Sequence, residues 1–175
     1  MNEAVIVSVA RTPIGKAFRG AFNDTEAPVL GGHVLRAVAE RAGVEPGSIE
    51  DVLLGAAAQQ GTQAYNLARL CTYTAGFPDT VPGMTVDRQC SSGLMTIAAV
   101  AKSIMVGEVD IAIGGGLESI SLVQNSHKNN YRAVSEAAIA AQPTAYIPMI
   151  ECSAPFGLQR CDVWFATLIS GHFPG

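Results

Sequence analysis

Residues 86–106 read VDRQCSSGLMTIAAVAKSIMV, and they carry a cysteine from a β-branched segment into the start of a strongly apolar one. From Leu94 to Val106 the apolar run is interrupted only by Thr96, Lys102 and Ser103. Such a run predicts a buried helix of about 16 residues, roughly 24 Å long. The cysteine, Cys90, would then lie at the N-terminal end of that helix.

Cys90 is the candidate catalytic residue of this segment. Backbone N–H groups and the helix dipole at a helix N-terminus favour a thiolate over a thiol, which lowers a cysteine pKa and raises its nucleophilicity. The small residues Ser91, Ser92 and Gly93 would keep the approach uncrowded. A second interpretation stays open at this point, because an unpaired cysteine most often behaves as a small buried hydrophobe.

The rest of the chain predicts an α/β fold. Apolar patterns and turn residues alternate between strand-like and helix-like segments. The expected strands are 4–10, 51–57, 84–89 and 110–115, and the expected helices are 29–42, 66–75 and 91–106. Glycines at 43 and 76, each followed by a nearby proline, are typical helix stops. Because parallel crossovers need a helix between strands, this order predicts a mixed, mostly parallel sheet with helices on its faces.

Composition is that of an ordinary globular domain. The chain has 175 residues, of which 49% are hydrophobic, and this is enough to bury a core. A net charge of −4 without a basic cluster argues against nucleic-acid binding. The start Met1-Asn2-Glu3 lacks the features of a signal peptide, and no uncharged apolar run approaches the ~20 residues that span a bilayer. A cytoplasmic protein that does not bind membranes is therefore expected.

Other chemistry-bearing residues have structural interpretations. The four cysteines do not form the framework of a small secreted protein, so no disulfide is expected. No metal site is expected, since Cys152 and Cys161 are too far apart for a Cys-x-x-Cys motif. The run Gly114 to Gly116 lacks phosphate-binding spacing and favours close backbone packing. His33 and His127 are interpreted as ordinary structural or surface histidines.

Four segments in order resemble the thiolase family. The segment Cys90 to Gly93 resembles the Cys-x-Ser-Gly nucleophile motif that opens a central buried helix in that family. The other three are Ala10-Arg11-Thr12-Pro13-Ile14-Gly15 with Phe18-Arg19-Gly20-Ala21-Phe22, Asn66-x-Ala68-Arg69, and Gly115-Gly116-Leu117-Glu118-Ser119. One departure is Asp87, which stands where the family usually has asparagine, so hydrogen bonding there is expected to differ.

The resemblance implies a fold, a reaction and partners. It covers about residues 1–151, with a thiolase-like N-terminal core at 1–122 and the start of a covering loop region at 123–151. It implies the N-terminal half of the thiolase fold, with Cys90 accepting an acyl group from an acyl-CoA in fatty acid metabolism. Acyl-CoA and CoA would be the substrates, with no separate cofactor or metal; residues that bind CoA are not assigned. A homo-oligomer is expected.

Residues 152–175 depart from the family pattern and are interpreted as a divergent tail. The apolar run Val163 to Ile169 has no evident strand partner. A frameshifted reading or an alternative exon end would produce such a tail, and a divergent but genuine C-terminal element is the alternative. The ending Gly171-His172-Phe173-Pro174 does not match the family's Gly-His-Pro segment, so no role is assigned to His172.

Three functional hypotheses follow. The first is a thiolase-type acyltransferase, weak or inactive as this chain, because neither the Gly-His-Pro nor the Cys-x-Gly-x-Gly segment occurs in it. By resemblance these segments supply the activating histidine and a second cysteine, so this chain offers only backbone N–H groups around Cys90 to stabilise an oxyanion. The second hypothesis is a non-catalytic fragment that self-associates or binds a full-length relative. The third is a relative of the ketoacyl synthases.

Overall fold

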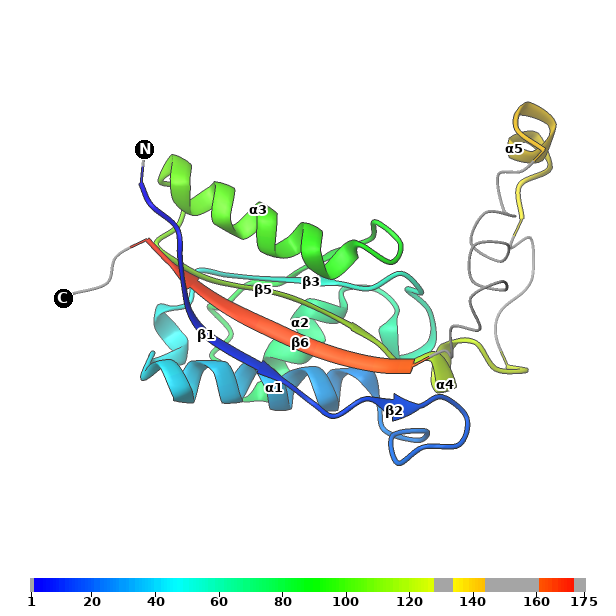
Figure 1. The fold of residues 1–175 in the computed structure, drawn as a ribbon, viewed down its shortest axis with the longest axis horizontal. Helices are drawn as coiled ribbons and strands as arrows, with labels where there is room; N and C mark the ends of the chain where they lie inside the picture. The colour runs from blue at the N-terminus through cyan, green and yellow to red at the C-terminus, as the bar shows by residue number, and fades with distance from the viewer. Residues whose placement is uncertain (1, 128–133, 144–160, 172–175) are drawn as a thin grey trace.

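The structure is a computed structural model, and it describes residues 2–127, 134–143 and 161–171 (Figure 1). Its elements in chain order are β1 (Val5–Arg11), β2 (Gly15–Lys16), α1 (Ala27–Ala42), η1 (Pro46–Ser48), β3 (Asp51–Gly55), η2 (Gly61–Gln63), α2 (Leu67–Ala75), β4 (Met84–Val86), α3 (Ser92–Val106), β5 (Ile111–Glu118), α4 (Ile120–Val123), α5 (Glu136–Ala141) and β6 (Cys161–Ser170). Every strand and helix predicted above is confirmed, with boundaries shifted by at most three residues. Gly43 and Gly76 end α1 and α2 in the left-handed conformation, as predicted.

The strands form one mixed sheet in the order β1-β6-β5-β3-β4, and the two-residue β2 pairs with β6 beside this path. β3 runs parallel to both of its neighbours, β4 and β5. β6 runs antiparallel to β5 on one side and to β1 on the other. The four strands β1, β3, β4 and β5 therefore share one direction, but only the two pairings of β3 are parallel. The sheet is mixed, as predicted.

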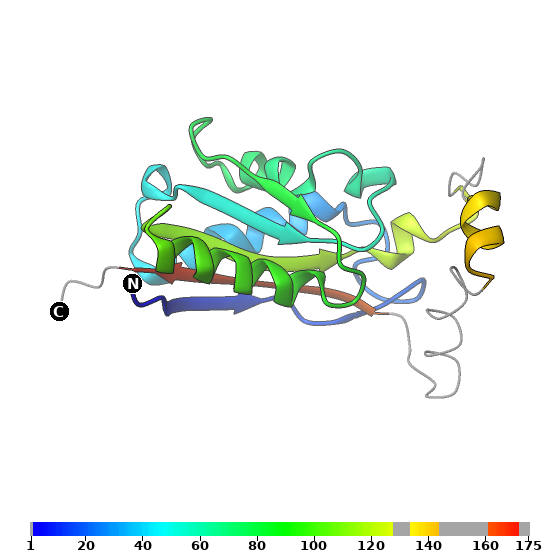
Figure 2. The same cartoon turned by 90° about the horizontal axis from the view of Figure 1, so that it is seen from above.

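Helices cover both faces of the sheet, as the sequence predicts. α1 and α2 lie together on one face, and α3 is the only helix of the described residues on the other (Figures 1 and 2). The larger core is formed between the sheet and the α1/α2 pair, with Leu35, Leu54 and Leu67 among its fully buried side chains. The smaller core lies under α3 and is built around Val100, Ile104 and Ile169. The fold is thus a three-layered α/β arrangement with unequal layers.

α3 is buried along one stripe only, whereas the sequence predicts a buried helix. Its buried residues are Ser92, Thr96, Val100 and Ile104, which repeat every four positions and face the sheet. On the outer side Leu94 is 69% exposed and Val106 is 74% exposed. α3 is only partly buried because a sheet face covers one side of a helix, and no other element of the described part of the chain lies over α3.

One segment of the described residues, which contains α3, is long and apolar enough to cross a membrane. This segment is Gln89–Val106, and 22% of it is buried. A helix that packs against the sheet of a globular protein can have the same length and composition. The contacts of α3 with β3, β5 and β6 show such packing here.

The apolar run of the tail is a strand, which corrects the expectation that it has no strand partner. β6 lies between β1 and β5, with Ile169 opposite both Ile6 and Ala112. The side chain of Ile169 is buried. The partner strands β5 and β1 lie about 50 and about 160 residues before β6 in the chain. The sequence pattern within residues 163–169 could therefore not reveal them. The division into 1–122, 123–151 and 152–175 stays a prediction.

Candidate active site

Cys90 lies where the sequence places it, between β4 and α3. Its side chain is exposed, and the next residue, Ser91, is the N-cap residue of α3. The N–H groups of Ser91 and Ser92 donate to the carbonyl oxygens of Arg88 and Gln89, at 3.2 and 3.0 Å. These two donors are therefore engaged within the turn, and an oxyanion near Cys90 would have to draw on other N–H groups.

The turn before Cys90 is held by side chains of its own residues. Oδ1 of Asp87 accepts a hydrogen bond from the N–H of Gln89 at 2.7 Å. Gln89 has a φ of 53°, which is left-handed backbone. The hydroxyl of Ser92 accepts from the N–H of Arg88 at 2.8 Å and donates to the carbonyl of Gln89. The hydroxyl of Ser92 thus holds the turn that precedes Cys90.

Glycines let the first turns of α3 lie directly on the sheet. A Cβ added to Gly55 would overlap the backbone of Ser92, and one added to Gly116 would come within 2.8 Å of Cα of Gly93. The hydroxyl of Thr96 donates to the carbonyl of Gly115 at 2.6 Å, which ties the helix to β5. The close backbone packing predicted for the run 114–116 is therefore confirmed. Side chains at these positions would push the Cys90 end of the helix away.

Glu118 anchors the loop beside the site. β3, β4 and β5 are parallel, so their carboxyl ends meet at one edge, and Gly55 pairs with both Val86 and Gly116 there. The carboxylate of Glu118 accepts from the N–H groups of Ala57 and Ala58, at 2.8 and 3.3 Å. This edge is where ligands usually bind in open α/β sheets.

Gln63 completes this anchor, and the sequence interpretation missed it. Its Nε2 donates to Glu118 at 2.6 Å and to the carbonyl of Ala58 at 2.8 Å. Its Oε1 accepts from the N–H of Ser119. The side chain is fully buried. An isolated glutamine in a loop of small and amide residues carries no pattern that would have identified it.

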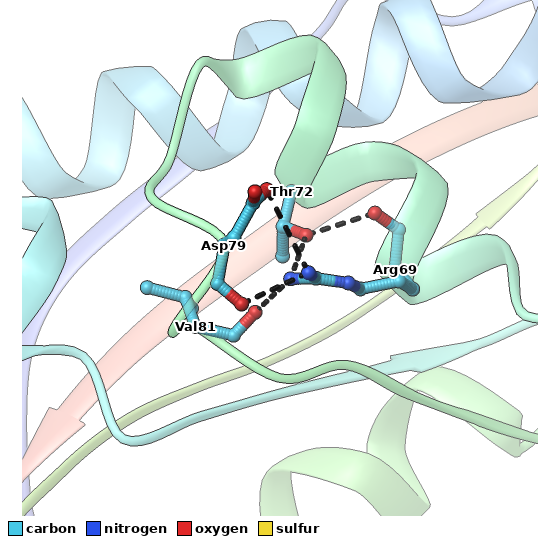
Figure 3. Close-up of polar contacts among 4 residues, drawn as sticks. All are labelled: Arg69, Thr72, Asp79 and Val81. Atoms are coloured by element: carbon cyan, nitrogen blue, oxygen red, sulfur yellow. Dashed lines mark hydrogen bonds and ion pairs between the residues drawn. The ribbon is translucent and has the colours of Figure 1, made fainter.

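Arg69 and Asn66 hold the chain that leads into β4. The Arg69 guanidinium donates to the carbonyls of Val81 and Asp79 (Figure 3). It also lies 4.2 Å from the ring centroid of Tyr73. Nδ2 of Asn66 donates to the carbonyl of Gly83 at 2.6 Å. The family-like segment Asn66-x-Ala68-Arg69 therefore fixes the approach to the Cys90 turn from the α2 side.

The two described histidines lie on other elements than Cys90: His33 is on α1, and His127 follows α4. His33 is exposed on α1, which covers the face opposite α3. His127 is exposed and lines an open cavity of about 410 Å³ together with Gln59, Gln60 and Asn125. His172 falls outside the described residues.

The other cysteine whose side chain is described, Cys71, differs from Cys90. Cys71 is completely buried, and burial raises the pKa of its thiol to about 12. Both residues carry thiols rather than disulfides. Cys152 and the side chain of Cys161 fall outside the described part. Within that part, no three His, Cys, Asp or Glu side chains are grouped so that they could hold a metal ion.

Comparison with known proteins identifies similar sequences and structures. The family model for the N-terminal domain of thiolases matches residues 4–154. The 3-ketoacyl-CoA thiolase of Bacillus subtilis (strain 168) is 47% identical over 123 residues, covering 70% of this chain and 32% of that protein. A peroxisomal 3-ketoacyl-CoA thiolase 5 of Arabidopsis thaliana is 48% identical over 120 residues, covering 69% and 26%.

A solved structure is also similar to this chain. The crystal structure of the Bacillus anthracis acetyl-CoA acetyltransferase superposes with a TM-score of 0.66 at 36% identity, and it covers 77% of this chain and 35% of that one. The chain thus spans about a third or less of the length of the curated relatives described above.

Proposed function

Because the chain belongs to the thiolase family, we propose that Cys90 accepts an acyl group from an acyl-coenzyme A thioester. The observation that carries the proposal is the position of Cys90: exposed, at the N-terminal end of α3, at the carboxyl edge of the parallel strands. The hydrogen bonds of Asn66 and Arg69 hold the chain before β4, and the glycines under α3 let that helix pack closely on the sheet. Both features fix the backbone on either side of Cys90.

The proposed step is thioester exchange. Sγ of the Cys90 thiolate attacks the carbonyl carbon of the acyl-CoA, and a tetrahedral intermediate forms. Its collapse breaks the bond to the CoA sulfur, which leaves as a thiolate, and an acyl-cysteine remains. The bond that forms and the bond that breaks both involve only Cys90 and the acyl-CoA. Acyl-CoA and CoA are the proposed substrates, in fatty acid metabolism.

Turnover is proposed to be weak for this chain. By the family resemblance, the base that activates the nucleophile and the cysteine that moves the α-proton come from Gly-His-Pro and Cys-x-Gly-x-Gly segments, which the sequence lacks. Loss of a positioned base commonly lowers a rate by about 10²-fold to 10⁴-fold. We therefore expect acylation of Cys90 to be easier to detect than condensation or thiolysis. A cytoplasmic location stays part of this proposal.

Intact mass measurement after incubation with acetyl-CoA tests the proposal. The expected result is a gain of one acetyl group, with the modified peptide containing Cys90. Cys90→Ser should abolish the gain, and Cys71→Ser should leave it unchanged, because Cys71 is buried between α1 and α2. Folded protein that gains no acetyl group would overturn the proposal. A pantetheine-linked acyl carrier in place of CoA tests the ketoacyl-synthase alternative.

A second candidate function is favoured by the outer face of α3. Leu94, Met105 and Val106 are 69%, 37% and 74% exposed on that helix. Exposed apolar surface of this kind commonly marks a protein interface. A non-catalytic chain could use it to self-associate or to bind a full-length relative.

Sedimentation at several concentrations tests this second function. Association that weakens in Leu94→Asp would support it, and Ile14→Asp, at an exposed apolar residue of the loop after β1, provides the matched control. A monomer at every micromolar concentration, with no complex when mixed with a full-length relative, would exclude it.

A further inference from the structure

We propose that Asp87 is a positioning residue that directs Cys90 by holding Gln89 in left-handed backbone. The inference rests on the proposed function, because it concerns the same nucleophile. It adds a role for the one position where the nucleophile segment departs from the family pattern. Asp87 acts through the backbone of Gln89 and does not itself take part in the reaction.

Gln89 is the strained point of the turn. It is one of three non-glycine residues with positive φ in the described chain, at 53°, and it immediately precedes Cys90. A side chain with a Cβ disfavours this region, and glycine adopts it readily. The turn therefore needs interactions that keep Gln89 there.

The carboxyl of Asp87 provides the interaction that involves the Gln89 N–H. The bond from that N–H to Oδ1 of Asp87 is 2.7 Å long and spans two residues, which is the pattern of an Asx turn. The carbonyl of Gln89 is held at the same time by the N–H and hydroxyl of Ser92. Both peptide groups of Gln89 are thus fixed, and Cys90 follows directly at the start of α3.

The role requires an acceptor oxygen rather than a charge. An asparagine at position 87 would offer the same Oδ1 acceptor, so Asp87→Asn should preserve the turn. Alanine offers none. If Gln89 is replaced by glycine, the left-handed conformation no longer needs the Asp87 acceptor. These substitutions therefore separate turn geometry from charge.

Alkylation of Cys90 by iodoacetamide, followed at the Cys90 peptide by mass spectrometry, tests the proposal. Asp87→Ala should slow the reaction about fivefold, since loss of one modest hydrogen bond changes an equilibrium by about two- to tenfold. Asp87→Asn should stay within about twofold of the starting protein on the same scale. The double variant Asp87→Ala/Gln89→Gly should recover most of the rate.

Asp110→Ala is the matched control, because Asp110 is also exposed but lies before β5, at the opposite edge of the sheet. It should not change the rate. An unchanged or faster rate in Asp87→Ala, or no recovery in the double variant while circular dichroism shows a folded protein, would overturn the proposal. Slowing in Asp87→Asn equal to that in Asp87→Ala would also overturn it.

The reagent keeps this test separate from the test of function. Iodoacetamide needs no acyl-CoA binding, so its rate reports how the Cys90 thiol is presented. If acetyl-CoA fails to acylate Cys90 while the alkylation rates follow the expected order, the proposed function fails and the positioning role stands. If Cys90 is acylated but the alkylation rates do not depend on Asp87, the proposed function stands and the positioning role of Asp87 fails.

Discussion

The two faces of the sheet differ in how completely they are covered. On one face α1 and α2 close over a continuous core that includes Leu35, Leu54 and Leu67. On the other face α3 covers a core of fewer residues and leaves its own outer side exposed. Cys90, the proposed nucleophile, lies at the start of the helix on this second face. The comparison predicts that stability is concentrated on the α1/α2 face, whereas the chemistry proposed for Cys90 and the proposed surface for association lie on the α3 face.

The two thiols give the largest expected contrast between these faces. Cys71 lies in the α1/α2 core against Gly31, and its raised pKa keeps it protonated at neutral pH. Its modification requires local or global opening, so Cys90 should react with iodoacetamide at least about a thousandfold faster. Peptide-resolved mass spectrometry over a time course measures both rates. Comparable rates in folded protein would show that the α1/α2 core opens far more readily than its packing indicates.

Leucine truncations on the two faces should differ in their effect on stability. Leu35→Ala leaves a cavity in the α1/α2 core and should lower the free energy of unfolding by about 3 kcal/mol. Leu94→Ala, on the exposed side of α3, should change it by less than about 0.5 kcal/mol. Urea denaturation of both variants gives the comparison. Equal losses would mean that the outer side of α3 is covered in solution, which would support the association hypothesis.

Local signals in the sequence predicted most of the α1/α2 face. The helical apolar pattern of α1 and the glycine stops at 43 and 76 depend only on neighbouring residues, and the structure confirms them. The position of Cys90 at the start of α3 was predictable for the same reason. The alternation of strands and helices was enough to predict the α/β class.

Long-range pairing was not predictable. β6 lies between two strands that are distant in sequence, and nothing within residues 161–170 specifies those partners. Gln63 contacts Glu118 from 55 residues away, and a single amide side chain has no periodic pattern. The exposure of α3 was also missed, because an apolar helix indicates burial without showing whether the rest of the chain covers it.

The smallest expected effect concerns Asp51, which lies at an incompletely packed point of the α3 face. Asp51 lines a cavity of about 240 Å³ with Ser103 and Glu108. Burial raises the pKa of its carboxyl above the ordinary 3.8, repulsion by Glu108 adds to this, and a hydrogen bond from the Val52 N–H opposes it. The folded protein therefore favours the protonated form of the Asp51 carboxyl over the charged form.

The sign of the pH dependence follows from that raised pKa. A folded-state pKa above the unfolded one means that the folded protein binds this proton more tightly. The stability that this provides is full below about pH 3.8 and is lost as pH rises through the folded value. Asp51→Asn keeps an acceptor for Val52 and removes the charge. It should therefore raise the melting temperature at neutral pH, and this gain should shrink as the solution is acidified.

Melting curves from acid to neutral pH measure this effect, with Asp110→Asn as a control at an exposed position. Glu108→Gln should give a smaller gain than Asp51→Asn, because repulsion by Glu108 contributes less to the raised pKa than burial does. A loss of stability in Asp51→Asn at neutral pH would contradict the assignment. Such a loss would mean that the ionised Asp51 carboxylate has a favourable charged or hydrogen-bonding partner in solution, despite the cavity beside it.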